Sequence, residues 1–221
     1  MGSWIELDTP QGRISAWHSA PDRAALGGLV VIQEIFGVNA HIRDVCDRFA
    51  REGFDVVAPA LFDPVERGVE LDYDKAGVAR GRDLVTALGF ERAVELVDAA
   101  ASWLRSHHHA KVGAVGFCWG GSLALLANTR LGLPSVSYYG ARSVGFLDEP
   151  LRAPMVFHFG EHDASIPPAD IEKHRQAYPQ AEVHLYDAGH GFNCDRRADY
   201  DSDAAATAWT RTVGFLRDAL A

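Results

Sequence analysis

The sequence predicts an α/β fold in which a mainly parallel central sheet is covered by helices on both faces. Several short runs are almost continuously apolar, which is typical of strands buried on both sides. These runs cover residues 29–33, 54–58, 111–117, 135–139, 155–160 and 182–186. Between them lie segments with helical periodicity, such as 90–104, where apolar residues recur at i, i+4 and i+7. Strands that alternate with amphipathic helices indicate a doubly wound α/β architecture.

The remaining segments complete this pattern. Residues 5–7 and 13–17 alternate between apolar and polar, which predicts an antiparallel hairpin or edge at the N-terminus. Asn39 can cap a helix that ends near Gly53, and residues 209–220 form an amphipathic C-terminal helix. Residues 63–81, rich in glycine and charge, are expected to be an irregular surface segment near the carboxyl ends of the strands, or a simple solvated connection.

Composition narrows the class of protein. The chain has 221 residues, 48% hydrophobic, and we expect one domain over 1–221. A net charge of −9 without basic clusters argues against nucleic acid. No signal peptide and no membrane-spanning run are evident, and we expect a cytoplasmic monomer or homodimer without cofactor or metal.

The chain has three cysteines, a small and odd number that does not fit a disulfide framework. Cys46 has the helical spacing of a core residue. Cys194 is interpreted as a packed bystander, with a second reactive thiol as the alternative. Consecutive histidines at 107–109 diverge around a helix end, so they predict no metal site.

The most informative stretch is Gly116-Phe-Cys118-Trp-Gly120-Gly. It follows a predicted strand and precedes a predicted helix, which is the context of a nucleophile elbow. Glycines on either side of Cys118 allow a sharp turn that exposes the side chain. The alternative is that Cys118 is a small buried apolar residue.

Two later residues fit the chain order nucleophile, acid, histidine. Asp163 follows the strand over 155–160, and His190 follows the strand over 182–186. Glu161 and His162 could compete for the role of Asp163, and each member could instead be a cap or a surface residue. Together they predict a Cys118–His190–Asp163 triad for acyl transfer.

The loop Gln33-Glu34-Ile35-Phe36-Gly37 follows another core strand. In an α/β-hydrolase this loop supplies one oxyanion-hole N–H, and the residue after the nucleophile supplies the other. These positions are Ile35 and Trp119. Glu34 is an unusual neighbour for an oxyanion site, and it is explained if it contacts the Cys118 thiol and governs its ionisation.

With these motifs and separations, the chain resembles the dienelactone hydrolase family (carboxymethylenebutenolidase type) from about Gly12 to Leu216. The motifs that carry the resemblance are Gln-Glu-Ile-Phe-Gly-Val-Asn, Gly-Phe-Cys-Trp-Gly-Gly, Gly-Glu-His-Asp and Gly-His-Gly-Phe. The resemblance implies an α/β-hydrolase fold without a lid domain, and hydrolysis of an enol-lactone or related ester. It also implies that Cys118, Asp163 and His190 form the triad, with Glu34 as the resting partner of the thiol.

The resemblance also implies two arginines that bind a substrate carboxylate, one in the irregular segment and one four residues after the histidine. The second position is Cys194 here, so we take Arg196 or Arg197 as its replacement and Arg80 or Arg82 as the first arginine. All four could equally be solvated charges. The aromatic residues expected to line the pocket, with core packing as the alternative, are Phe36, Trp119, Tyr138, Tyr139 and Phe192.

These residues predict attack by the Cys118 thiolate and an acyl-thioester that water hydrolyses with His190 as base. Two other functions compete with this one. The first is a general carboxylesterase or thioesterase on the same scaffold, and the second is a ligand-binding protein that kept the fold without catalysis. An intact triad with an oxyanion loop argues against the second.

Overall fold

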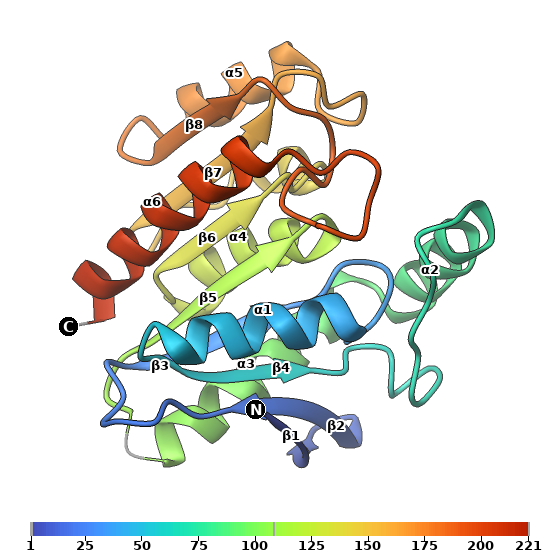
Figure 1. Cartoon of the computed structure of the whole chain (residues 1–221), viewed down its shortest axis with the longest axis vertical. Coiled ribbons are helices and arrows are strands. Elements are labelled where there is room, and N and C mark those ends of the chain that lie inside the picture. The colour runs from blue at the N-terminus through green and yellow to red at the C-terminus, as the bar shows by residue number, and fades with distance from the viewer. Residues whose placement is uncertain (1, 108, 221) are drawn as a thin grey trace. The chain divides into compact units, whose positions relative to one another are not determined.

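The structure is a computed structural model that describes residues 2–107 and 109–220. Contacts divide the chain into two compact units, Met1–Gly113 with Leu220–Ala221, and Ala114–Ala219. Figure 1 shows the predicted α/β arrangement, in which strands and helices alternate along the chain. Each unit is described by itself.

The first unit contains four strands in the order β1-β2-β4-β3. Their bounds are β1 Ser3–Thr9, β2 Gly12–Ser19, β3 Gly28–Ile32 and β4 Asp55–Pro59. The first two form the antiparallel hairpin that the alternating pattern predicts, whereas β3 and β4 are parallel and fully buried. Helices α1 (Ala40–Arg51) and α3 (Phe90–Ser106) both pack on β4, one in front of the strands and one behind in Figure 1.

The start of α1 confirms the predicted cap. The side chain of Asn39 accepts hydrogen bonds from the backbone N–H groups of His41 and Ile42 at 3.1 and 3.2 Å. These bonds satisfy two amides that have no partner within the first turn of a helix. The Asn39 cap therefore fixes the position where the loop that carries Glu34 joins helix α1.

The segment over 63–81 is more regular than the sequence predicts, because its second half belongs to α2 (Lys75–Leu88). Asp74 caps this helix by accepting from Gly77 N–H at 2.7 Å. A Cβ at Gly77 would lie 2.0 Å from the carbonyl oxygen of Asp72, and one at Gly81 would lie 2.3 Å from that of Ile35. The glycines that indicated a loop are instead places where the helix touches other backbone.

The second unit contains the parallel strands β5 to β8, in that order, with β5 (Val112–Phe117) entering from the first unit. The others are β6 Ser135–Tyr138, β7 Met155–Gly160 and β8 Glu182–Tyr186. Its helices are α4 Trp119–Leu131, η1 Ser143–Phe146, α5 Pro168–Ala177 and α6 Ser202–Leu220. Helix α6 crosses in front of β6 and β7 in Figure 1.

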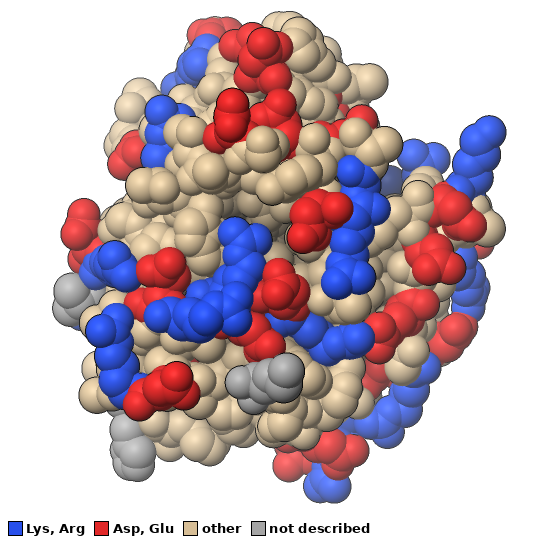
Figure 2. Space-filling model, viewed as in Figure 1, with Lys and Arg blue, Asp and Glu red and all other residues tan. Residues whose placement is uncertain are grey.

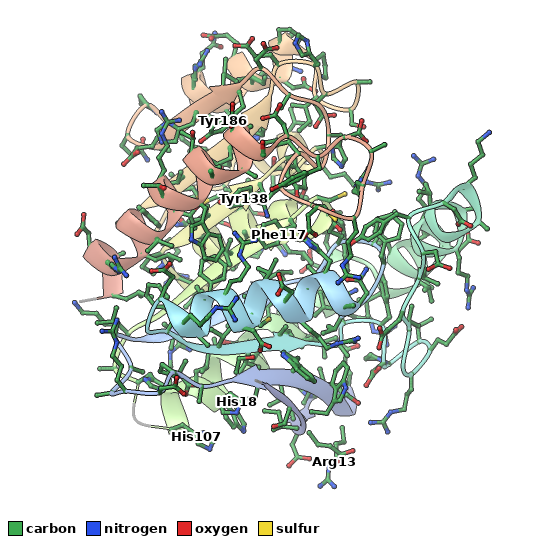
Figure 3. All side chains as sticks on the ribbon, in the orientation of Figure 1. Arg13, His18, His107, Phe117, Tyr138 and Tyr186 are labelled. Carbon is green, nitrogen blue, oxygen red and sulfur yellow. The ribbon has the colours of Figure 1, made fainter. Side chains whose placement is uncertain are left out.

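A buried hydrogen-bonded chain links this sheet to α6. Figure 3 labels Tyr138 and Tyr186 at its two ends. The hydroxyl groups of Tyr138 and Thr212 are 2.7 Å apart, His158 Nε2 lies 3.0 Å from Thr212, and His158 Nδ1 lies 2.9 Å from the Tyr186 hydroxyl. The three hydroxyl groups and both ring nitrogens of this chain thus have hydrogen-bond partners inside the core.

The surface agrees with the charge composition. Figure 2 shows acidic and basic side chains interspersed over the face that it draws.

The histidines at 107–109 have separate surroundings in the first unit. His107 stacks on Trp103 with ring centroids 3.7 Å apart, and His109 Nε2 lies 2.7 Å from Asp55, whereas His108 lies outside the described residues. None of the helices in the described part of the chain is long and apolar enough to cross a bilayer.

Candidate active site

Cys118 occupies the sharp turn between β5 and α4 that the sequence predicts. Its backbone is left-handed, with φ 56° and ψ −117°, a conformation that costs free energy in a residue with a Cβ. A Cβ at Gly116 would lie 1.8 Å from the carbonyl oxygen of Gly120, so only glycine lets α4 approach β5 this closely. The strained turn presents a partly exposed thiol at the N-terminus of α4.

His190 and Asp163 converge on this thiol within the second unit. The Nε2 atom of His190 lies 3.2 Å from Cys118 Sγ, and its Nδ1 atom lies 2.7 Å from Asp163 Oδ2. The other carboxylate oxygen of Asp163 accepts the backbone N–H of Ser165 at 2.8 Å, which holds the carboxylate in place. This is the nucleophile, base and orienting acid geometry of acyl-transfer enzymes.

The two residues that could have competed with Asp163 lie elsewhere. Glu161 is exposed, and the exposed His162 side chain pairs with Asp187 on the surface at 2.5 Å. Asp163 is buried, at 4% exposed. The structure therefore selects Asp163 among the candidate acids of this loop.

The electrostatics favour a charged imidazole. Burial by itself would lower the pKa of His190, but hydrogen bonds to Asp163 and Cys118 outweigh it and raise the pKa to about 10. An imidazolium at 3.2 Å and the positive end of α4 both stabilise a negative sulfur. His190 is therefore held as an imidazolium at neutral pH, next to Cys118 Sγ.

Glu34 lies in the first unit, in the loop after β3, and its side chain is fully buried. Its Oε2 atom accepts a hydrogen bond from the hydroxyl of Tyr73 at 2.9 Å. Tyr73 could not be predicted as a partner of Glu34 from the sequence, because it lies in a charged segment with no local motif. Ile35 and Trp119, the predicted oxyanion donors, are in the first and second unit respectively, and their joint role stays a prediction.

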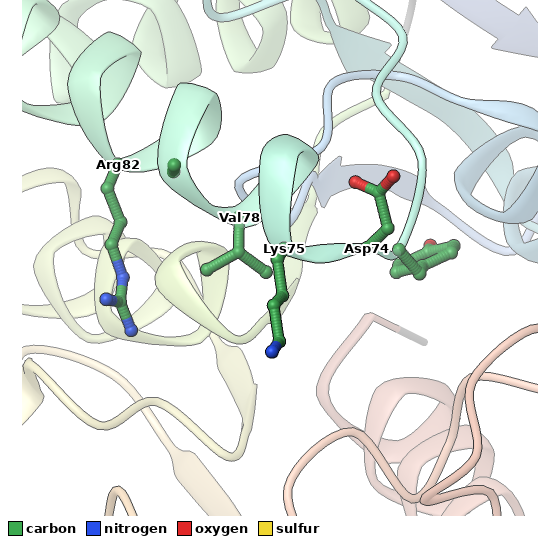
Figure 4. A pocket seen from close by; sticks show the side chains of 6 residues that line it. Asp74, Lys75, Val78 and Arg82 are labelled. Carbon is green, nitrogen blue, oxygen red and sulfur yellow. The ribbon is translucent and has the colours of Figure 1, made fainter.

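The candidate arginines differ in their surroundings. Arg80 forms an ion pair with Glu66, whereas Arg82 lines a hollow of about 650 Å³ together with Tyr73 and Lys75. Figure 4 shows Lys75, Val78 and Arg82 on the same side of α2, with Asp74 turned away. In the first unit, Arg82 is therefore better placed than Arg80 to meet a ligand.

In the second unit, Arg196 is exposed, whereas the side chain of Arg197 packs against the loop that carries His190. A Cβ at Gly191 would lie 2.8 Å from the Arg197 guanidinium. This group therefore packs against Gly191, the residue that follows His190 in the sequence. Arg197 also lies 3.8 Å from Asp199. The residue next to the expected Arg196 thus approaches the site.

The aromatic candidates are well packed. Phe36 stacks near Tyr73 with ring centroids 4.5 Å apart, and Tyr138 and Phe192 are fully buried. Both of the latter contact Tyr139, whose ring lies 5.2 Å from that of His190. In this structure Tyr138 and Phe192 support the site through Tyr139.

Comparisons with known proteins identify the family to which this chain belongs. Residues 14–220 match the Dienelactone hydrolase family. The chain is 36% identical to a Synechocystis protein named "Putative carboxymethylenebutenolidase" over 83% of this chain and 82% of that one. It is 32% identical to the carboxymethylenebutenolidase of Pseudomonas putida, over 89% of this chain and 88% of that one.

Among solved structures, a Klebsiella pneumoniae protein described as a "Putative Dienelactone Hydrolase" superposes with a TM-score of 0.85 at 30% identity, over 97% of both chains. The match to the family extends over nearly the whole sequence, including every motif of the predicted site. The chain belongs to the dienelactone hydrolase family and is a hydrolase with an α/β-hydrolase fold.

Proposed function

We propose that this protein hydrolyses an enol-lactone or related carboxylic ester with Cys118 as the nucleophile. The observation that carries the proposal is the line of contacts from Asp163 Oδ2 to His190 at 2.7 Å and on to Cys118 Sγ at 3.2 Å. The names of the relatives, carboxymethylenebutenolidase, support the same substrate class. The reducing cytoplasm is the proposed compartment, since all three cysteines are free thiols.

In the first half of the reaction, the thiolate of Cys118 attacks the acyl carbon and a C–S bond forms. The carbonyl oxygen becomes an oxyanion, which the backbone N–H groups of Trp119 and Ile35 are proposed to stabilise. The C–O bond then breaks, and the imidazolium of His190 gives its proton to the leaving oxygen. An enolate is a good leaving group, so it departs with little help from acid catalysis.

In the second half, the now neutral His190 takes a proton from water, and the resulting hydroxide equivalent attacks the thioester. The C–S bond breaks, releasing the carboxylic acid and restoring the thiolate beside the imidazolium. Asp163 keeps the ring in the tautomer whose Nε2 faces the sulfur. One water is consumed for each ester bond broken.

The test is turnover of an enol-lactone and of p-nitrophenyl acetate by Cys118→Ala and His190→Ala. We expect both variants to lose at least ~10³-fold in kcat, the scale seen when a member of a nucleophile–base pair is removed. Mass spectrometry of the wild type quenched in acid should show an acyl group on the Cys118 peptide. Full activity of Cys118→Ala would exclude the cysteine as nucleophile.

We propose that Arg197, which packs on the loop carrying His190, binds an acidic group of the substrate, and such binding separates a lactone hydrolase from a general esterase. Arg197→Ala should raise KM for a carboxylated lactone by ~10-fold or more, the scale of one charge-assisted hydrogen bond, and leave p-nitrophenyl acetate almost unaffected. Arg175→Ala, on exposed α5, is the control. If Arg196→Ala raises this KM and Arg197→Ala does not, the exposed Arg196 is the residue that binds the substrate carboxylate.

A further inference from the structure

Tyr73 touches the buried carboxylate of Glu34 from a distant part of the chain. Its hydroxyl donates to Glu34 Oε2 at 2.9 Å, although the two residues are 39 positions apart. Its ring packs on Phe36, with centroids 4.5 Å apart. A hydrogen bond to a buried charged acceptor is among the stronger single polar contacts in a protein.

The direction of this hydrogen bond is set by Asn39. The Oδ1 atom of Asn39 accepts two backbone N–H groups of α1, which leaves Nδ2 pointing the other way, where it lies 3.1 Å from the Tyr73 oxygen. An amide nitrogen can only donate, so the tyrosine oxygen accepts from Asn39. The phenolic proton is therefore free to point at Glu34, as the structure has it.

The segment that carries Tyr73 is tied to the Glu34 loop by its backbone. Leu71 N–H donates to the carbonyl oxygen of Phe36 at 2.9 Å, and Glu70 forms an isolated bridge with Gly37. Arg43 adds an ion pair to Glu70 and a hydrogen bond to Val38 O, both at 2.7 Å. These contacts hold the phenol in position before any substrate binds.

We propose that Tyr73, oriented by Asn39, is a positioning residue that fixes the carboxyl group of Glu34 in its working orientation. The residue that caps α1 thereby determines, through one amide and one phenol, how the Glu34 carboxyl group is oriented. The proposal rests on the proposed function together with the role expected for Glu34 from the sequence, which is to govern the ionisation of the Cys118 thiol. Another titratable group of this unit that faces Glu34 is His41, with a ring nitrogen within 4.8 Å of a carboxylate oxygen.

The test is the pH profile of kcat/KM and of iodoacetamide alkylation of Cys118 in Tyr73→Phe. This variant keeps the ring on Phe36 and leaves His41 in place, so it removes only the hydroxyl. We expect the acidic limb of both profiles to move up by about one pH unit, the scale of one hydrogen bond to a charged group. Asn39→Ser keeps a helix-capping oxygen but removes the amide donor, and should move the limb in the same direction by less.

The matched control is Tyr178→Phe, which removes a buried hydroxyl that donates to Glu149 O at 2.8 Å in the second unit. It should lower thermal stability by a similar amount without moving the pH profile. A Tyr73→Phe profile that keeps the wild-type limb, at any level of activity, overturns the proposal. If Tyr73→Phe folds poorly, the Asn39→Ser profile decides the question by the same criterion.

Glu34→Gln separates failure of this proposal from failure of the proposed function. If Glu34→Gln leaves the pH profile unchanged while Cys118→Ala is inactive, the role expected for Glu34 is wrong and the proposed nucleophile stands. If Glu34→Gln changes the profile but Tyr73→Phe does not, only the role of Tyr73 is rejected. In a Glu34→Gln background, Tyr73→Phe should add no further shift.

Discussion

At the scale of single residues, the site depends on two costs that the fold imposes. Cys118 is held with a left-handed backbone, and His190 is held charged although it is largely removed from water. Each cost is offset by a local contact. The first is met by close packing of the elbow glycines, and the second by the hydrogen bonds to Asp163 and Cys118.

The charge on His190 can be tested by titration. The pKa is raised to about 10 in the folded protein, so one imidazole followed by NMR should titrate near pH 10 rather than near 6.5. This group therefore contributes stability that is complete below about pH 6.5 and is lost as the pH rises through about 10. In Asp163→Asn the midpoint should fall, and a wild-type midpoint near that of free histidine would contradict the assignment.

The elbow glycine can be tested by adding one methyl group. Gly116→Ala places a Cβ against the Gly120 carbonyl oxygen, where the space is only 1.8 Å. We expect urea unfolding to show a loss of about 3 kcal/mol or more, because two backbones must separate. Gly145→Ala, with nothing within 4 Å of the added Cβ, should change stability little. Equal stabilities of the two variants would show that the elbow tolerates expansion.

At the scale of elements, buried polar pairs attach helices to the second unit. Ser143 in η1 and His174 in α5 are both buried, with Ser143 Oγ 2.7 Å from His174 Nε2. His174 Nδ1 lies 2.7 Å from the carbonyl oxygen of Asp170 and donates its proton there. Ser143 Oγ also donates to the carbonyl oxygen of Gly140, so this hydroxyl connects the turn before η1 to the imidazole of α5.

The burial of His174 predicts acid destabilisation with a definite cause. Burial lowers the pKa of His174, so below about pH 6.5 the unfolded chain takes up a proton that the folded protein does not. The free energy of unfolding should fall by up to about 1.4 kcal/mol per pH unit from this group. His174→Gln should flatten the decline of the melting temperature between pH 6.5 and 5. His158, whose pKa burial also lowers, keeps part of the slope in that variant.

At the scale of the whole molecule, the three cysteines differ in how far the fold buries them, and we expect their reactivity toward alkylating reagents to differ accordingly. Cys46 and Cys194 are fully buried, and burial raises the pKa of the Cys46 thiol well above its usual range. Cys118 alone among them is partly exposed. We therefore expect Cys118 to be the most reactive of the three thiols.

Iodoacetamide should therefore label the native protein at Cys118 alone. Peptide mass spectrometry after a short reaction at pH 7 is the measurement. In urea above the unfolding midpoint all three cysteines should react, which controls for intrinsic reactivity. Native labelling of Cys194 at the rate of Cys118 would show that Cys194 is a second reactive thiol.

The order of elements and the triad could be predicted from the sequence by itself. The strands at 155–160 and 182–186 have the expected bounds, and Cys118, Asp163 and His190 follow strands as expected. Strand periodicity and an elbow are local patterns, because each depends on neighbours within a few residues. The resemblance to the family extended this reading to the substrate class.

Only the tertiary structure decided which distant residues meet. Tyr73 reaches Glu34 across 39 positions, and Arg197 rather than Arg196 packs on the His190 loop. Gly77 and Gly81 indicated a loop in the sequence but allow a helix to touch backbone in the fold. Such contacts depend on the paths of separate segments through space, and no periodicity along the chain encodes them.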